Sequence, residues 1–237
     1  MAKAFPDWRV LAHGPIEELA PNLWRVSGSL PMMSLRRTMV VARLDDGRLV
    51  VHNGIALDEP AMQRIEQWGR PAFLIIPSGY HRLDAPAYKR RYPALTVLAP
   101  RGARAKIAPV LLVDGALEEF PAGGAVRFEP LQGIADREGV MLVESPDGVT
   151  VVLGDVVFNM DRKRDPLGFL FTTLMGSAPG PRVSRLARAL LVKDRAALRR
   201  DLERLAATPR LVRLVVAHEK VASGPDAAAA LRQAATY

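Results

Sequence analysis

Three segments of the chain end in residues of ligand type, and each follows an apolar run typical of a buried strand. The run at 72–76 (AFLII) is followed by His81 and Asp84, the run at 150–153 by Asp155, and the run at 211–217 by His218. Ligands of open α/β sheets bind beside the carboxyl ends of the strands, because the loops leaving the strands converge there. We therefore expect the functional edge of the molecule where these loops meet.

Each of these residues also has a purely structural interpretation. His81 and His218 are equally consistent with buried histidines that only form hydrogen bonds. Asp155 could satisfy backbone N–H groups of a turn, and Asp84 could cap the helix expected from residue 86. His52, beyond another strand, is assigned a supporting or structural role near the edge, as is Tyr80.

The elements that must position these residues follow from the apolar patterns. Strands are expected at 22–28, 38–44, 49–51, 72–76 and 95–99, and again at 125–130, 139–144, 150–153 and 211–217. Helices are expected at about 59–68, 86–91, 184–191, 194–207 and 225–235, while 155–180 looks irregular. Each half thus has strands first, then helices and a last strand. This order predicts two β-sheets packed between two helical layers.

Composition bounds the class of protein. The 237 residues are 49% hydrophobic, enough for one large domain, which we place at 21–237 after a leader at 1–20. The absence of cysteine excludes disulfides, thiolate metal sites and cysteine nucleophiles. No signal peptide or membrane-spanning run is recognisable, so a cytoplasmic location is expected.

The net charge of +8 is concentrated in one segment, 181–213, where ten Lys and Arg residues accompany three carboxylates. A solvated helical surface explains such a segment, and so does steering of nucleic acid, anionic lipid or acidic substrates. Aromatic residues make up only 6% of the chain, and no stacking or groove-reading motif accompanies the charge, which argues against nucleic acid.

The apolar stretch 167–176 (LGFLFTTLMG) is flanked by a basic triplet at 162–164 and by Pro179. It is too short to cross a bilayer. A mobile lid over the edge that carries Asp155, an interface patch, peripheral contact with a membrane and an ordinary buried connection all remain open for it.

The order of elements and the strand-end residues resemble the metallo-β-lactamase superfamily, over about residues 22–235. The family's first motif, His-x-His-x-Asp-His, falls on 79–84 (GYHRLD), where only His81 remains and Asp84 holds the last position. Gly154-Asp155 matches the bridging aspartate and His218 the closing histidine, but Ile134 stands near where a further histidine is usual. The resemblance implies a single-domain, four-layer αββα sandwich with a degenerate metal site.

In that family the site holds two metals, and here the resemblance leaves His81, Asp84, Asp155 and His218. Two imidazoles and two carboxylates suit one Zn, Mn or Fe(II) ion. Of the four, Asp84 is expected to point away. The resemblance implies a one-metal hydrolase of a small ester, lactone or related substrate. The alternative is a non-catalytic pseudoenzyme that keeps the fold without metal and binds a small ligand or a partner. The substrate and the oligomeric state do not follow from the sequence.

Overall fold

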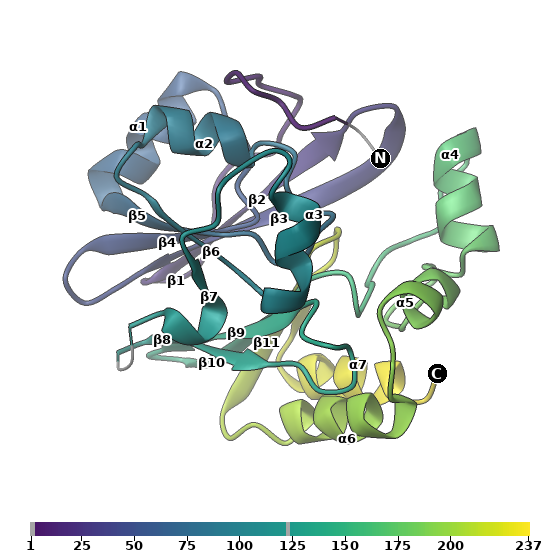
Figure 1. Cartoon of the computed structure of the whole chain (residues 1–237). Helices are drawn as coiled ribbons and strands as arrows, with labels where there is room; N and C mark the ends of the chain where they lie inside the picture. Colours follow the sequence, from purple (N-terminus) through teal and green to yellow (C-terminus); the bar gives the residue numbers. More distant parts are fainter. Residues whose placement is uncertain (1–2, 122–123) are drawn as a thin grey trace.

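Two β-sheets pack face to face between two layers of helices in the computed structural model, which describes residues 3–121 and 124–237 (Figure 1). The strand order is β1-β2-β3-β4-β5-β6-β7 in the first sheet and β12-β11-β10-β9-β8 in the second. This single-domain αββα sandwich is the architecture that the order of strand and helix patterns predicted.

The first sheet is built by the N-terminal half of the chain. Its strands are β1 (Glu17–Ala20), β2 (Leu23–Leu30), β3 (Met33–Arg43), β4 (Arg48–His52), β5 (Arg70–Ile75), β6 (Thr96–Ala99) and β7 (Gly115–Ala116). The helices of this half are α1 (Glu59–Trp68), α2 (Ala85–Arg91) and α3 (Arg104–Ile107), with short 3₁₀ turns η1 (Arg101–Ala103) and η2 (Leu117–Glu119).

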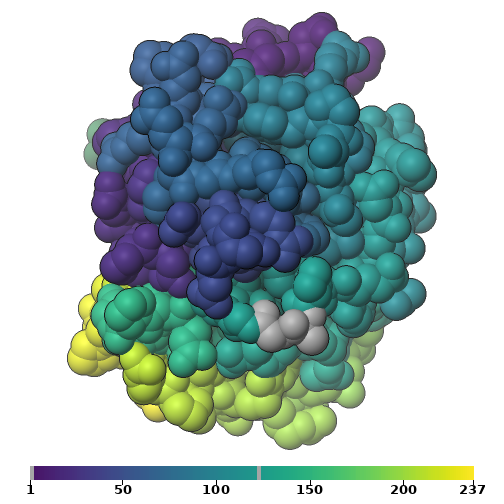
Figure 2. Space-filling model, turned by 90° about the vertical axis from the view of Figure 1, so that its left-hand side faces the viewer, coloured from purple at the N-terminus to yellow at the C-terminus, as the bar shows by residue number. Residues whose placement is uncertain are grey.

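The C-terminal half builds the second sheet. Its strands are β8 (Val126–Pro130), β9 (Gly139–Ser145), β10 (Gly148–Leu153), β11 (Leu211–Val216) and β12 (Ala222–Ser223). The helices are α4 (Pro166–Phe169), the π-helical turn η3 (Leu170–Leu174), α5 (Arg185–Leu190), α6 (Arg195–Ala206) and α7 (Pro225–Ala234). In Figure 2 the early residues fill the upper part of the visible face and the late residues the lower part.

Three apolar layers hold the sandwich together. Val50 of β4 belongs to the layer between the two sheets, with Met141, Val152 and Val215, whereas its neighbour Val51 packs under α1 and α2. The second sheet shows the same alternation, because Val151 packs toward α6 and α7 and Val152 toward the first sheet. Strands buried on both faces read as continuous apolar runs, which explains why the sequence marked them clearly.

Two parallel strand pairs set the functional edge. β4 runs parallel to β5 in the first sheet, and β10 runs parallel to β11 in the second. The carboxyl ends of these strands are followed by Asn53, by the loop with His81, by Asp155 and by His218. The two sheets thus present the ends of these four strands to a shared edge.

The structure differs from the sequence-based expectations in three places. Glu17–Ala20, inside the expected leader, pairs with β2 as an edge strand, so the leader is shorter than 1–20. The region expected to be irregular contains α4 and η3. The two-residue strands β7 and β12 were not expected. Within the described residues, no helix is long and apolar enough to cross a membrane.

Candidate metal centre

His81, Asp155 and His218 come together at this edge, each from a different loop. One ligand atom from each lies within 4.8 Å of the others. Nε2 of His81 is 2.7 Å from Oδ1 of Asp155, and Nε2 of His218 is 3.5 Å from the same oxygen. The three side chains are at most 13% exposed, so water competes weakly for these contacts.

Asn53 fixes the orientation of the His81 ring. Its amide nitrogen donates to the carbonyl of Thr38 at 2.7 Å, which leaves its Oδ1 to accept from Nδ1 of His81 at 3.1 Å. Asn53 adopts a left-handed backbone conformation (φ 56°), which asparagine tolerates better than most residues. Because Nδ1 of His81 is the donor to Asn53, Nε2 is the atom that must face Asp155.

A main-chain carbonyl group fixes the orientation of the His218 ring in the same way. Its Nδ1 donates to the carbonyl oxygen of Arg36 at 2.9 Å, and Phe158 stacks on the ring at 5.5 Å. Its Nε2 therefore also points toward Asp155. Holding a ring nitrogen by a carbonyl, so that the other nitrogen carries the lone pair, is the usual way in which proteins prepare a histidine for a metal.

Asp155 completes the convergence. Ser78 donates its hydroxyl to Oδ2 at 2.8 Å, which leaves Oδ1 for the two imidazoles. Burial by itself raises the pKa of Asp155, but the charge and hydrogen bonds of His81 and His218 outweigh it and hold that pKa well below its usual range. An ionised Oδ1 facing two Nε2 atoms requires a positive charge among them, either a proton or a metal ion.

The donor set fits a small divalent ion. Ligand atoms about 2.0–2.2 Å from a tetrahedral centre are roughly 3.3–3.6 Å apart. The distance between Asp155 and His218 already has this value, whereas the contact between Asp155 and His81 would have to lengthen by less than about 1 Å. Two imidazoles and one carboxylate leave room for a further ligand, as catalytic metal sites require.

β3 carries the groups that orient both histidines. The Arg36 carbonyl holds His218, the Thr38 carbonyl holds Asn53, and the Thr38 N–H donates to the Ala217 carbonyl of the opposite sheet at 2.7 Å. This strand therefore connects the two sheets at the site.

Glu138 holds the Asp155 loop from beneath. Its buried carboxylate accepts the backbone N–H groups of Gly154, Asp155 and Val156 at 2.7, 2.6 and 3.1 Å. Burial and the nearby Asp155 charge raise the pKa of Glu138 to about 8. A Cβ at Gly154 would lie 2.8 Å from the Glu138 carboxyl carbon, so the glycine is needed for this close approach.

Asp84 lies outside the cluster, as expected for this one of the four candidates, so it is not part of the ligand set. Its Oδ2 is 2.6 Å from Nη2 of Arg37, and both side chains are at most 3% exposed. It occupies the cap position of α2, but its side chain makes no capping hydrogen bond. The physical reason is the buried guanidinium of Arg37, which provides the carboxylate with a countercharge away from the histidines.

The other two candidates neighbour the cluster without joining it. His52 is 2% exposed at the end of β4, and burial followed by the charge of His81 lowers its pKa to about 3. The Tyr80 hydroxyl accepts from Nζ of Lys106 at 2.6 Å, and the same ammonium lies 4.1 Å from the ring centre.

At the positions where the resemblance would place further ligands, the chain has buried apolar residues or a glycine in close contact with a neighbouring side chain. Ile134 is fully buried in the layer under α6, and Leu83 is buried beside the loop of His81. A Cβ at Gly79 would lie 2.8 Å from Cβ of Lys106. A histidine at residue 79 would therefore have to displace the Lys106 side chain.

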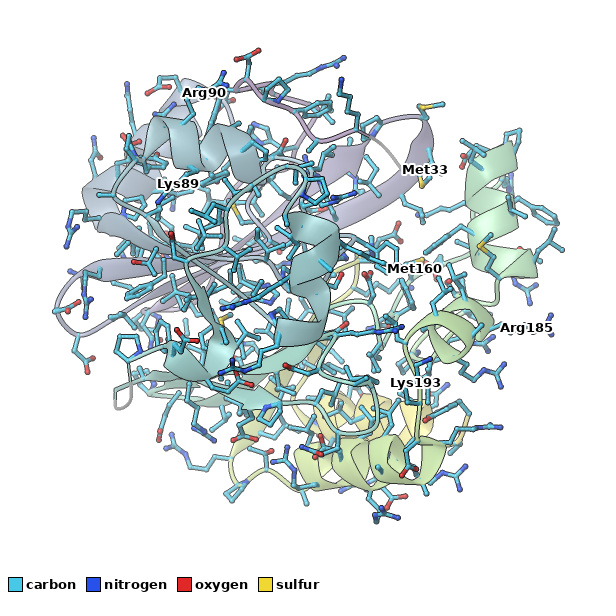
Figure 3. All side chains as sticks on the ribbon, in the orientation of Figure 1. Met33, Lys89, Arg90, Met160, Arg185 and Lys193 are labelled. Carbon is cyan, nitrogen blue, oxygen red and sulfur yellow. The ribbon has the colours of Figure 1, made fainter. Side chains whose placement is uncertain are left out.

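The segment expected as a lid lies against the cluster. The Phe171 ring in η3 is 6.4 Å from that of His218, and Ser34 of β3 donates a hydrogen bond to Asp165 at the start of α4. Figure 3 shows Met33 at the start of β3, on the side facing α4. Leu167 and Phe169 of α4 are 40% and 47% exposed, so this cover has an apolar outer face.

Sequence reasoning missed Asn53, Glu138 and the carbonyl of Arg36. Asn53-Gly54 after a strand was a visible turn signal, yet nothing in it specified contact with a histidine 28 residues later. Glu138 and the Arg36 carbonyl had no local signal, because their roles arise only when the two sheets pack.

Comparison with known proteins supports the fold. No protein-family model matches the chain, and no curated protein matches it in sequence. Solved structures do match: the DIM-1 metallo-β-lactamase exposed to ceftazidime (TM-score 0.63, 11% identity, 97% of this chain and 98% of that one). The metallo-β-lactamase from Pontibacter korlensis also matches, with a TM-score of 0.61 and 10% identity over 93% of this chain and 98% of that one. The metallo-β-lactamase from Erythrobacter litoralis with β-mercaptoethanol in the active site matches with a TM-score of 0.60 and 13% identity over 93% of this chain and 95% of that one. The chain therefore has the metallo-β-lactamase fold, with a His/Asp/His cluster that could hold a metal.

Proposed function

We propose that this chain, which folds like the metallo-β-lactamases, binds one divalent metal through His81, Asp155 and His218 and hydrolyses a small ester or lactone. One observation carries the proposal. Both histidines have Nδ1 committed to an acceptor, Asn53 Oδ1 or the Arg36 carbonyl, so both Nε2 atoms converge on Oδ1 of Asp155. A cluster of lone pairs held from behind in this way suits a metal ion.

Each residue has a distinct task in this proposal. Nε2 of His81 and of His218 and Oδ1 of Asp155 hold the ion, and Ser78 keeps Oδ2 of Asp155 occupied. A bound Zn, Mn or Fe(II) ion supplies a Lewis acid, which polarises a carbonyl or phosphoryl group. Phe171 covers the His218 side and reduces access of bulk water. The apolar face of α4 favours a substrate with an apolar part.

Metal uptake tests the proposal directly. Protein stripped with EDTA and dialysed should bind about one zinc per chain in isothermal titration calorimetry. His81→Ala and His218→Ala should each weaken zinc binding by more than about 100-fold, the upper end of the loss seen when only an outer partner of a ligand is removed. Elemental analysis of protein purified without chelator should agree with the stoichiometry.

His13→Ala is the matched control, because this histidine lies near Asp58 and away from the cluster. It should leave zinc affinity unchanged. Equal weakening by His13→Ala and His81→Ala would show that the titration reports nonspecific binding. Two zinc ions per chain at high occupancy would contradict the one-metal site.

Hydrolysis is tested after metal uptake. The zinc-loaded protein should cleave members of a panel of p-nitrophenyl esters and aliphatic lactones, and His218→Ala should lose that activity. Zinc uptake without turnover of any ester or lactone would refute the hydrolase and retain the metal site.

A pseudoenzyme is the second candidate, and the short contact between His81 and Asp155 favours it. At 2.7 Å the two side chains contact each other directly, and a proton between them would close the site in place of a metal. This candidate predicts no zinc uptake and an unchanged melting temperature in EDTA.

A further inference from the structure

A pocket lies between the end of η3, the N-terminal part of α5 and the end of α7. Its volume of about 360 Å³ falls within the range of small-molecule sites. The pocket shares none of its lining residues with the His/Asp/His cluster. The residues that line it are Arg162, Thr173, Gly176, Ala178, Pro181, Arg182, Val183, Arg185, Arg188, Gln233, Thr236 and Tyr237.

Four arginines and no carboxylate side chain line this pocket: Arg162, Arg182, Arg185 and Arg188. None of their guanidinium groups forms an ion pair or a hydrogen bond with any residue in the described parts of the chain. Arginines elsewhere, such as Arg91 and Arg204, each pair with two carboxylates. Like charges gathered around one hollow repel one another unless an anion lies between them.

Two polar groups inside the pocket wall strengthen this conclusion. Nε of Arg188 and Oγ1 of Thr173 are buried and have no hydrogen-bond partner among the described residues. Buried polar groups are nearly always paired, and unpaired ones require an explanation. Both atoms belong to residues that line the pocket, and a turn of either side chain toward a bound acceptor would pair it.

The chemistry of the wall defines the ligand. The planar guanidinium matches the oxygens of a phosphate with two parallel hydrogen bonds. The volume is about ten times the roughly 30 Å³ that a water molecule occupies in the liquid, so a bare phosphate would not fill it. Ala178, Pro181, Val183 and Tyr237 also line the wall and are the residues available for contact with an organic part.

We propose that this arginine pocket binds a small organic phosphate, a phosphomonoester with a compact apolar group. Figure 3 shows Arg185 at α5, at the end of the molecule where this pocket lies. Phenyl phosphate is a suitable probe, and it should bind saturably to the full chain in calorimetry at fixed ionic strength. Inorganic phosphate should bind more weakly, because it lacks the apolar part.

Arg185→Gln and Arg188→Gln should each weaken phenyl phosphate binding by about tenfold or more, the loss expected for one charge-assisted hydrogen bond. Arg232→Gln is the control, because it removes the same charge from an exposed position of α7 outside the pocket. It should change the affinity by less than about twofold, as a screened surface charge does. Arg185 is exposed, so its variant should fold even if Arg188→Gln does not.

Four outcomes would overturn the proposal. The first is the absence of saturable binding, and the second is equal weakening by Arg232→Gln. The third is binding to vesicles containing phosphatidylglycerol without binding to phenyl phosphate, which would assign the arginines to a lipid surface. Retained binding in His81→Ala supports a site separate from the metal centre, and lost binding there overturns it.

Discussion

Replacing His52 with leucine should remove much of the loss of stability that acid causes in this fold. The His52 ring is 2% exposed, and its Nδ1 is buried without a hydrogen-bond partner among the described residues. Burial, followed by the charge of His81, lowers its pKa from 6.5 to about 3. The folded chain therefore keeps this imidazole neutral at pH values where the unfolded chain protonates it.

The sign and size of the effect follow from proton linkage. Between pH 6.5 and about 3 the unfolded state binds one more proton than the folded state, so the free energy of unfolding falls as the pH falls. At pH 5 this single group should cost about 2 kcal/mol relative to pH 7.5. That is a substantial share of the stability of an ordinary domain.

Urea denaturation at pH 7.5 and pH 5, with EDTA present, measures the effect. The difference between the two pH values should be about 2 kcal/mol smaller in His52→Leu than in the wild type. Contributions of the other titrating groups cancel in this comparison. His13→Leu is the control, because it removes a partly buried histidine whose ring lies 3.6 Å from Asp58. An equal loss in the wild type and in His52→Leu would refute the reasoning.

Three further changes test the site and its supports. Asn53→Ala should weaken zinc binding about 10–100-fold while keeping its stoichiometry, because it frees Nδ1 of His81; unchanged affinity in calorimetry would count against its orienting role. Asp84→Asn should lower the free energy of unfolding by about 3–5 kcal/mol, since it leaves Arg37 buried without a countercharge, and a loss of zinc stoichiometry would instead place Asp84 in the cluster. In free zinc at 100 times the dissociation constant of the site, removal of the zinc with EDTA should cost about 2.7 kcal/mol of stability, and a melting curve that EDTA does not move would refute zinc binding.

The fold could be predicted from sequence because its strands are buried on both faces. The runs 72–75 of β5 and 151–153 of β10 are apolar throughout, and turn residues follow both strands. β1 has the sequence EELA and lies at a sheet edge, so neither pattern nor burial marked it. α4 begins with Asp165-Pro166, a helix-start signal that was overlooked within a glycine-containing stretch.

The site could be predicted only as far as strand ends reveal it. His81, Asp155 and His218 each follow a predicted strand, and the parallel pairs bring those ends together. The orienting groups could not be predicted, because every residue has a carbonyl and only packing selects that of Arg36. The pairing of Asp84 with Arg37 likewise joins residues 47 positions apart.

The hydrogen bond from Thr38 to Ala217 has a consequence for assembly of the chain. The first sheet and His81 come from residues 3–121, and Asp155 and His218 come from residues 124–237. A metal held by all three would cross-link the two halves of the molecule. If the chain is produced as two fragments, 1–121 and 124–237, zinc should hold them together, and their association should depend on the zinc concentration.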